Sequence, residues 1–220
     1  MKHYLVFAFL LICTSKAAAQ DFETKEWNAA SHDKALIFYL SGDGGFNKFS
    51  NSLCEALNEQ GYDVSALSCR SYFWDKKTPE QAASDISNYL STKLSSRENQ
   101  QVVIVGYSFG ADIVPFIIAR LPNEISDKIS VSYMMAASGT TDFEIHWSDI
   151  LGGHSKREKD VITELNKLTD KKIVLINASD DQDLDLSRIT IKYKSEMLPG
   201  SHHFDGDTNE IAKVIVNDMN

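Results

Sequence analysis

Residues 101–112 read QVVIVGYSFGAD, and this stretch decides the fold. Its first half is an apolar, β-branched run typical of a buried strand, and the residues after Phe109 continue with a helical pattern. Ser108 stands at the junction, with Gly106 two positions before it and Gly110 two positions after it. This pattern predicts a nucleophile elbow, a strained turn that lifts the serine hydroxyl above the edge of a sheet, where only glycines fit at the flanking positions.

Apolar runs alternate with helical patterns along the rest of the chain. We predict strands at 34–42, 63–69, 101–108, 128–138, 171–180 and 188–195, and helices at 79–96, 161–168 and 209–219. The alternation predicts the α/β class, with a mostly parallel sheet of about six or seven strands and helices on both faces. With the elbow, it predicts the α/β-hydrolase fold. No long helical insertion follows the fourth predicted strand, so we expect no large lid, and the polar stretch 151–160 is expected to be a mobile loop.

The first residues, MKHYLVFAFLLICTSKAAAQ, have the pattern of a signal peptide. A short basic start precedes an apolar run, and small residues then lead to an expected cleavage site after Ala19. We therefore expect residues 1–19 to be removed and residues 20–220 to form a single domain that is periplasmic or secreted. Acylation of Cys13 is the alternative, but Ile12 stands where a lipoprotein signal has a small residue.

Composition limits the classes of function. The 220 residues are 43% hydrophobic and carry a formal charge of −9, which suits a globular domain, argues against nucleic acid binding and favours a cationic substrate or partner. Cys54 and Cys69 remain after the signal peptide, and both a disulfide between them and two buried free thiols stay open. No Cys/His pattern indicates zinc, so we expect no metal and no cofactor.

A serine nucleophile needs a histidine base and an orienting carboxylate, which in this fold come later in the chain. The segment MLPGSHHFDGD (197–207) follows the last predicted strand and supplies His202 as the base, with His203 in reserve. Asp180, Asp181 and Asp183 follow the preceding strand. Counting from the end of that strand favours Asp181, whereas counting back from the next element favours Asp183.

Backbone amides would stabilise the oxyanion that forms during ester cleavage. The N–H of Phe109, at the start of a helix, is the first candidate. The glycine-rich loop SGDGGF (41–46) follows the first predicted strand and supplies the second, with Asp43 preferred over Gly44. No Lys-Ser/Thr pair follows these glycines, which argues against a phosphate-binding loop.

Three adjacent aromatic residues, Tyr72, Phe73 and Trp74, follow the second predicted strand. Adjacent side chains on one element cannot all face its core, so at least one is expected to line the substrate site or its rim. The alternative is an aromatic cluster that only anchors the loop.

Several longer segments resemble the bacterial virulence protein VirJ/AcvB family of exported α/β-hydrolase domains. They are FYLSGDGGF, SYFWDKKTPEQAASDI, VGYSFGADIVPF, DFEIHW and LPGSHHFDGD. The resemblance runs from about residue 34 to the C-terminus. It implies that Ser108 is the nucleophile and that the His202-His203 motif supplies the base.

Three positions depart from the family pattern. The acidic turn of the family has a glycine where Ala178 stands here, and its Asp-Ser/Thr pair becomes Asp183-Leu184, which favours Asp183 over Asp181 by a small margin. Phe46 replaces the usual tryptophan and is expected to change the shape of the substrate pocket.

The sequence therefore predicts an exported serine hydrolase that cleaves a carboxylic ester through an acyl-enzyme. The resemblance implies two further properties. AcvB-type members hydrolyse aminoacylated phosphatidylglycerol in the periplasm, chiefly the lysyl form, so the substrate would be an aminoacyl-phospholipid head group at a membrane surface. VirJ-type members are linked to type IV secretion and virulence, so a scaffold that binds secretion-system proteins is an alternative, as is a generic carboxylesterase or thioesterase.

Overall fold

The computed structural model describes residues 22–145 and 157–219. The strands are β1 (Thr24–Trp27), β2 (Leu36–Leu40), β3 (Val64–Leu67), β4 (Val102–Tyr107), β5 (Ile129–Met135), β6 (Thr140–Thr141), β7 (Lys159–Asp160), β8 (Ile173–Ala178) and β9 (Lys194–Leu198). The helices are α1 (Lys48–Glu59), α2 (Cys69–Tyr72), α3 (Pro79–Ser95), α4 (Phe109–Ile118), α5 (Asn123–Ser126), α7 (Val161–Leu165) and α8 (Thr208–Met219). Two 3₁₀ turns, η1 (Leu186–Arg188) and η2 (Phe204–Gly206), complete the described elements.

Seven strands form one sheet in the order β1-β3-β2-β4-β5-β8-β9. Every neighbouring pair is parallel except β1 with β3, which is antiparallel. The carboxyl ends of the six parallel strands therefore lie along the same edge of the sheet, which is where such sheets bind ligands. A separate two-stranded ribbon joins β6 to β7.

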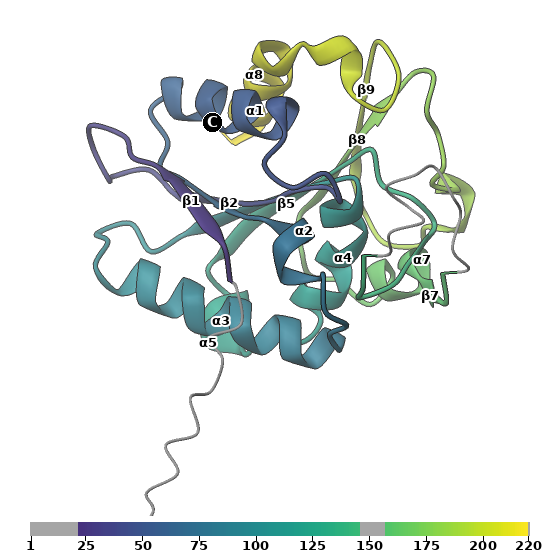
Figure 1. The fold of residues 1–220 in the computed structure, drawn as a ribbon, viewed down its shortest axis with the longest axis horizontal. Helices are drawn as coiled ribbons and strands as arrows, with labels where there is room; N and C mark the ends of the chain where they lie inside the picture. The colour runs from purple at the N-terminus through teal and green to yellow at the C-terminus, as the bar shows by residue number, and fades with distance from the viewer. Residues whose placement is uncertain (1–21, 146–156, 220) are drawn as a thin grey trace, which may run out of the picture.

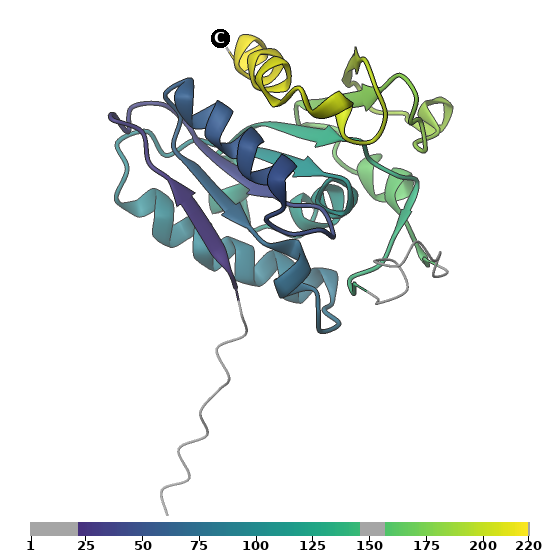
Figure 2. The same ribbon diagram turned by 45° about the horizontal axis from the view of Figure 1, so that its top comes forward.

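The sheet has a hydrophobic core on each face because its strands are apolar at consecutive positions. Along β2, Phe38 packs with the cluster that α3, α4 and α7 cover, whereas Ile37 and Tyr39 pack on the other face with α1 and α8. Figure 1 shows α1 and α8 on one side of the sheet and α3 and α5 on the other. The turned view in Figure 2 also shows α1 beside α8. The first turns of α1 and the turn before α8 both lie at the carboxyl edge.

Local sequence signals explain where the helices begin. At α3, Thr78 accepts a hydrogen bond from the N–H of Gln81, the Gln81 side chain accepts one from the N–H of Thr78, and Pro79 occupies the first helical position. At α1, the side chain of Asn47 accepts a hydrogen bond from the N–H of Ser50.

The predicted strands and helices are confirmed with one exception, and β1, β6, β7, α1, α2 and α5 were not predicted. The last strand is β9 at Lys194–Leu198, so the prediction of a strand at 188–195 is wrong: its first residues belong to η1 and an irregular segment. The antiparallel edge strand β1 was not predicted, since its four residues, TKEW, carry a weak apolar pattern. The expected signal peptide lies outside the described residues. Residues 146–156 do too, so the expected absence of a lid and the first part of the expected mobile loop at 151–160 are not tested, whereas the last two residues of that loop form β7.

The two cysteines are free and buried on opposite faces of the sheet. Cys54 belongs to the cluster under α1, and Cys69 to the cluster around Phe38. The sequence left open a disulfide or two buried free thiols, and the structure has the two free thiols. Burial raises the pKa of each thiol. Over the described ranges, no helix is both long enough and apolar enough to cross a membrane.

Candidate active site

Ser108 joins the end of β4 to the start of α4 in a strained backbone conformation. Its φ is 53° and its ψ is −122°, and its N–H donates to the carbonyl of Met135 at the end of β5 over 2.9 Å. The flanking glycines are sterically required. A Cβ on Gly106 would lie 2.6 Å from the carbonyl oxygen of Gly110, and a Cβ on Gly110 would lie 2.2 Å from the carbonyl oxygen of Leu40. The predicted elbow is therefore present in its geometry.

The hydroxyl of Ser108 is within hydrogen-bond distance of an imidazole. The distance from Ser108 Oγ to Nε2 of His202 is 2.8 Å, and Nδ1 of the same ring contacts Oδ2 of Asp181. The structure thus joins a serine hydroxyl, an imidazole and a carboxylate in one chain of contacts, the arrangement that serine hydrolases use. His203, the reserve candidate, is exposed and turns its ring edge-on to Phe49, with 5.8 Å between ring centroids.

Backbone hydrogen bonds hold the loop that carries the carboxylate beside the loop that carries the imidazole. The N–H of Ser179 donates to the carbonyl of Leu198 over 2.9 Å, and the N–H of Asp180 donates to the carbonyl of Gly200 over 3.0 Å. These bonds continue the pairing of β8 with β9 beyond the strand ends. The distance between Asp181 and His202 is therefore fixed by the sheet.

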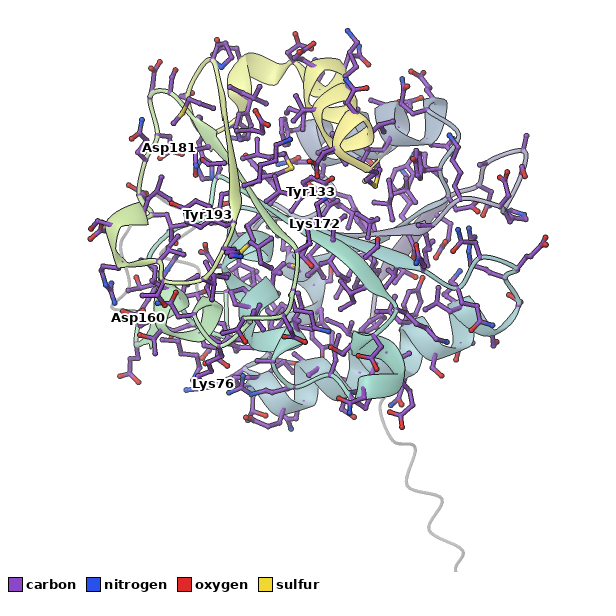
Figure 3. The ribbon with its side chains drawn as sticks, turned by 180° about the vertical axis from the view of Figure 1, so that it is seen from behind. Lys76, Tyr133, Asp160, Lys172, Asp181 and Tyr193 are labelled. Carbon is purple, nitrogen blue, oxygen red and sulfur yellow. The ribbon has the colours of Figure 1, made fainter. Side chains whose placement is uncertain are left out.

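Asp181, rather than Asp183, is the carboxylate that contacts His202, contrary to the small preference drawn from the family pattern. Ala178 and Asp181 form an isolated bridge, so the chain turns back directly after β8 and brings Asp181 to the histidine loop. Asp183 is exposed, and its backbone carbonyl lies near Gly139 in the loop after β5. Figure 3 shows Lys172 and Asp181 at opposite ends of β8: Lys172 precedes the strand and Asp181 follows it.

Tyr107 is a site residue that sequence reasoning missed. Its hydroxyl donates to the carbonyl oxygen of His202 over 3.1 Å, and its ring centroid lies 5.6 Å from that of His202 and 4.6 Å from that of Phe49. Burial, followed by the carboxylates of Asp43 and Asp181, raises the pKa of Tyr107 above its ordinary value, so the phenol stays a hydrogen-bond donor. The side chain of Tyr107 therefore holds the loop that carries His202 in position.

The glycine-rich loop after β2 runs beside the nucleophile. A Cβ on Gly42 would lie 3.3 Å from the Cβ of Ser108, so the loop comes close to Ser108 at Gly42. Asp43, the preferred second oxyanion donor, is the next residue, and Gly44 follows it. The loop is held by the buried Ser41, whose hydroxyl donates to the carbonyl of Gly42 and accepts from the N–H of Cys69, both over 3.0 Å.

The other expected oxyanion donor lies at the start of α4. Phe109 is the first residue of that helix, so helix geometry leaves its N–H without an acceptor in the preceding turn. This N–H is one peptide unit from the Ser108 side chain. The assignment of both oxyanion donors remains a prediction.

A buried carboxylate fastens α4 to the loop after β5. Asp112 is 2% exposed and accepts hydrogen bonds from the N–H and the hydroxyl of Ser138, over 2.6 and 2.7 Å, while Arg157 lies 3.7 Å away. Burial raises the pKa of Asp112 to about 7, although the bonds from Ser138 and the charge of Arg157 act in the opposite direction. This carboxylate is also a residue that the sequence did not single out.

Two of the three adjacent aromatic residues are buried in the core, so Trp74 is the member that stays a candidate for the substrate site or its rim. Tyr72 and Phe73 are 2% and 0% exposed: the Tyr72 hydroxyl donates to Asp85, and the Phe73 ring packs 5.3 Å from that of Phe109. Trp74 is 38% exposed, and Phe46 is half-buried against the cluster under α1. The short α2 explains the outcome, because its helical turn directs Tyr72 and the following Phe73 into the core.

The model of a family described as bacterial virulence protein (VirJ) matches residues 33–220. No curated protein matches the chain.

Solved structures show the fold. Est1E from Butyrivibrio proteoclasticus has a TM-score of 0.62 at 13% identity, with 89% of this chain and 92% of that chain covered. MenH from S. aureus has a TM-score of 0.66 at 10% identity, covering 88% and 96%. An alpha-beta serine hydrolase homologue from Coxiella burnetii has a TM-score of 0.61 at 14% identity, covering 90% and 91%. The chain has the α/β-hydrolase fold, as predicted.

Proposed function

This chain belongs to the VirJ family of bacterial virulence proteins, and we propose that it is a serine hydrolase that cleaves carboxylic esters through an acyl-enzyme. One observation carries the proposal: Ser108 Oγ lies 2.8 Å from Nε2 of His202, whose Nδ1 contacts Asp181. The strained elbow adds support, because a domain that only binds a partner has no need of it. The α/β-hydrolase fold and the esterases that share it are consistent with this chemistry.

The first half of the reaction forms the acyl-enzyme. His202, with Nδ1–H donating to Asp181, accepts the Ser108 proton on Nε2 while Oγ forms a bond to the ester carbonyl carbon. The carbonyl oxygen becomes an oxyanion, which the N–H of Phe109 and that of Asp43 stabilise. The bond from carbon to the leaving oxygen then breaks, and Nε2–H protonates the alcohol that departs.

The second half regenerates the enzyme. Water replaces the alcohol, His202 accepts one of its protons, and the resulting hydroxide attacks the acyl carbon. Collapse of this second tetrahedral intermediate releases the carboxylic acid, and His202 returns the proton to Ser108. Neither half of the reaction requires a metal or a cofactor.

A fluorophosphonate probe tests the proposal because it reports an activated serine whatever the substrate is. The mature protein should be labelled at one residue, and Ser108→Ala should abolish both labelling and hydrolysis of short acyl esters. Ser96→Ala is the matched control, since Ser96 is an exposed serine after the far end of α3. Normal labelling of the Ser108→Ala protein would refute the mechanism.

The finer substrate proposal is an aminoacyl ester of phosphatidylglycerol, chiefly the lysyl form, hydrolysed outside the cytoplasm after removal of residues 1–19. The resemblance to AcvB-type members and the formal charge of −9 support it, since the lysyl head group is cationic. Vesicles that contain lysyl-phosphatidylglycerol should lose lysine when the mature protein is added. A clear preference for simple acyl esters or thioesters would instead indicate a generic carboxylesterase or thioesterase.

The second candidate function is binding of secretion-system proteins, which membership of a virulence family favours. Wild type and Ser108→Ala separate the two functions in cells. A scaffold keeps its partners in a pull-down and keeps the cellular phenotype when the serine is lost, whereas an enzyme loses the phenotype.

A further inference from the structure

Strand β9 forms a free edge of the sheet. The sheet ends at β1 on one side and at β9 on the other, and Figure 1 shows these two strands at opposite ends of it. The C=O of Leu198 accepts a hydrogen bond from the N–H of Ser179 over 2.9 Å, directly after β8, so this carbonyl faces inward. Successive residues of a strand direct their backbone groups to opposite sides, so those of Ser195 and Met197 face outward. Across residues 22–145 and 157–219, the structure has no hydrogen bond to these outward groups.

This edge lacks the features that usually keep an edge strand from pairing with another chain. Such strands are commonly interrupted by a bulge or a proline, or carry a lysine that points into solvent. Strand β9 pairs with β8 in unbroken register and contains no proline, and Asp218 holds its lysine, Lys194, against α8 over 2.8 Å. The side chain of Met197 is 49% exposed, and Trp74 is the other large hydrophobic side chain that is exposed within the described ranges. Strand β9 therefore presents free backbone groups together with an exposed apolar side chain.

The sequence of this edge is complementary to itself. Residues 193–197 read YKSEM, and an antiparallel second copy with Ser195 opposite its own counterpart brings Lys194 opposite Glu196 and Tyr193 opposite Met197. Opposite charges across two strands, and an aromatic ring beside a thioether, are favourable pairs. In this register the outward backbone groups of Ser195 face each other and exchange hydrogen bonds. We propose that β9 pairs antiparallel with β9 of a second copy of this chain, which joins two sheets edge to edge in a symmetric dimer.

The charges on β9 select this register over its neighbours. A shift of two residues in one direction brings Lys194 opposite Lys194 of the second copy, and the same shift in the other direction brings Glu196 opposite Glu196. Like charges directly opposite each other destabilise a strand pair. A shift of one residue sets outward backbone groups against groups that already bond to β8, so hydrogen bonds are lost. Because the same edge serves both copies, the assembly closes at two chains.

Sedimentation velocity over a wide range of concentrations, up to the millimolar range, tests the dimer in the mature protein. Wild type should change from monomer to dimer as the concentration rises. Ser195→Pro removes an N–H that β8 does not use, so the monomer should fold while the dimer is lost. Ser195→Ala is the matched control, because both variants lose the hydrogen bond from Nδ2 of Asn177 to Ser195 Oγ but only proline blocks the edge. Circular dichroism and the urea midpoint show whether each variant is folded.

Charge reversal tests the register and serves if Ser195→Pro does not fold. Glu196→Lys sets lysine opposite lysine in both symmetry-related pairs, and Lys194→Glu sets glutamate opposite glutamate. Each variant alone should raise the dissociation constant of the dimer by roughly tenfold or more. An equimolar mixture of the two should restore dimerisation, since lysine then faces glutamate in both pairs. Glu124→Lys is the matched control, because it makes the same charge change at an exposed residue of α5 and should leave the dissociation constant unchanged.

These measurements do not depend on the proposed hydrolase function. Dimerisation of wild type that is lost in the Ser195→Pro protein or in the single charge variants, and that returns when the charge variants are mixed, supports the paired edge. A wild type that stays monomeric up to the millimolar range overturns the inference. So does a dimer that a folded Ser195→Pro protein still forms, or one that Glu196→Lys leaves unchanged, because such a dimer would use another surface.

Discussion

Replacing Asp181 by asparagine should inactivate the hydrolase, whereas the same change at Asp183 should not. Only Asp181 contacts Nδ1 of His202, while Asp183 is exposed and lies nearer the loop after β5. Both substitutions remove one negative charge from the same short loop and add the same amide. The pair therefore isolates the contact with the imidazole from a general change in local charge.

The size of the loss follows from the charge that develops on His202. A carboxylate at about 4 Å from the centre of an imidazolium stabilises it by about 4 kcal/mol at an effective dielectric constant of about 20. The side chains of His202 and Asp181 are 40% and 19% exposed, so solvent lowers this to about 3 kcal/mol, or roughly a hundredfold in kcat. Asparagine can also donate to Nδ1 and stabilise the tautomer that cannot accept the serine proton, which brings the expected loss to about a thousandfold.

The assay is hydrolysis of a short acyl ester, with the rate of fluorophosphonate labelling measured in parallel. Asp181→Asn should reduce kcat about a thousandfold and slow the labelling, with little change in KM, because the contact acts in the transition state. Asp183→Asn should stay within about twofold of wild type. Loss of activity in Asp183→Asn with retention in Asp181→Asn would refute the geometric argument, as would equal activity in both.

Three further predictions concern the framework of the site. Gly110→Ala places a Cβ 2.2 Å from the carbonyl oxygen of Leu40, so urea denaturation should show a loss of about 3 kcal/mol in the free energy of unfolding; an unchanged midpoint would contradict the steric argument. Tyr107→Phe removes the hydrogen bond to the carbonyl of His202 and should lower kcat about tenfold with KM nearly unchanged, so equal kcat values would remove its positioning role. The pKa of Asp112 is about 7 when folded and lies above its value in the unfolded chain, so its contribution to stability is present at low pH and is lost as pH rises from about 4 through 7. Asp112→Asn should therefore flatten the decline in the urea midpoint between pH 5 and pH 8, and an unaltered decline would show that another group causes it.

The local sequence was sufficient to predict the fold and the strained elbow that carries Ser108. Consecutive apolar, β-branched residues, such as Val102–Val105, indicate a buried parallel strand. The elbow requires small residues two positions before and two positions after Ser108, and this requirement is visible in the sequence. The same reasoning identified His202, because a histidine on the loop after the last strand has few positions to occupy. All of these features depend on residues near one another in the chain.

The tertiary structure alone decided which carboxylate and which aromatic rings belong to the site. Asp181 and Asp183 are equivalent in sequence, and the turn after Ala178 together with the pairing of β8 and β9 brings Asp181 to His202. The sequence made Tyr72 a candidate for the substrate site, but α2 directs its side chain into the core. Side-chain direction in a loop depends on backbone contacts with distant strands, and these contacts leave no periodic pattern in the sequence for local reasoning to detect.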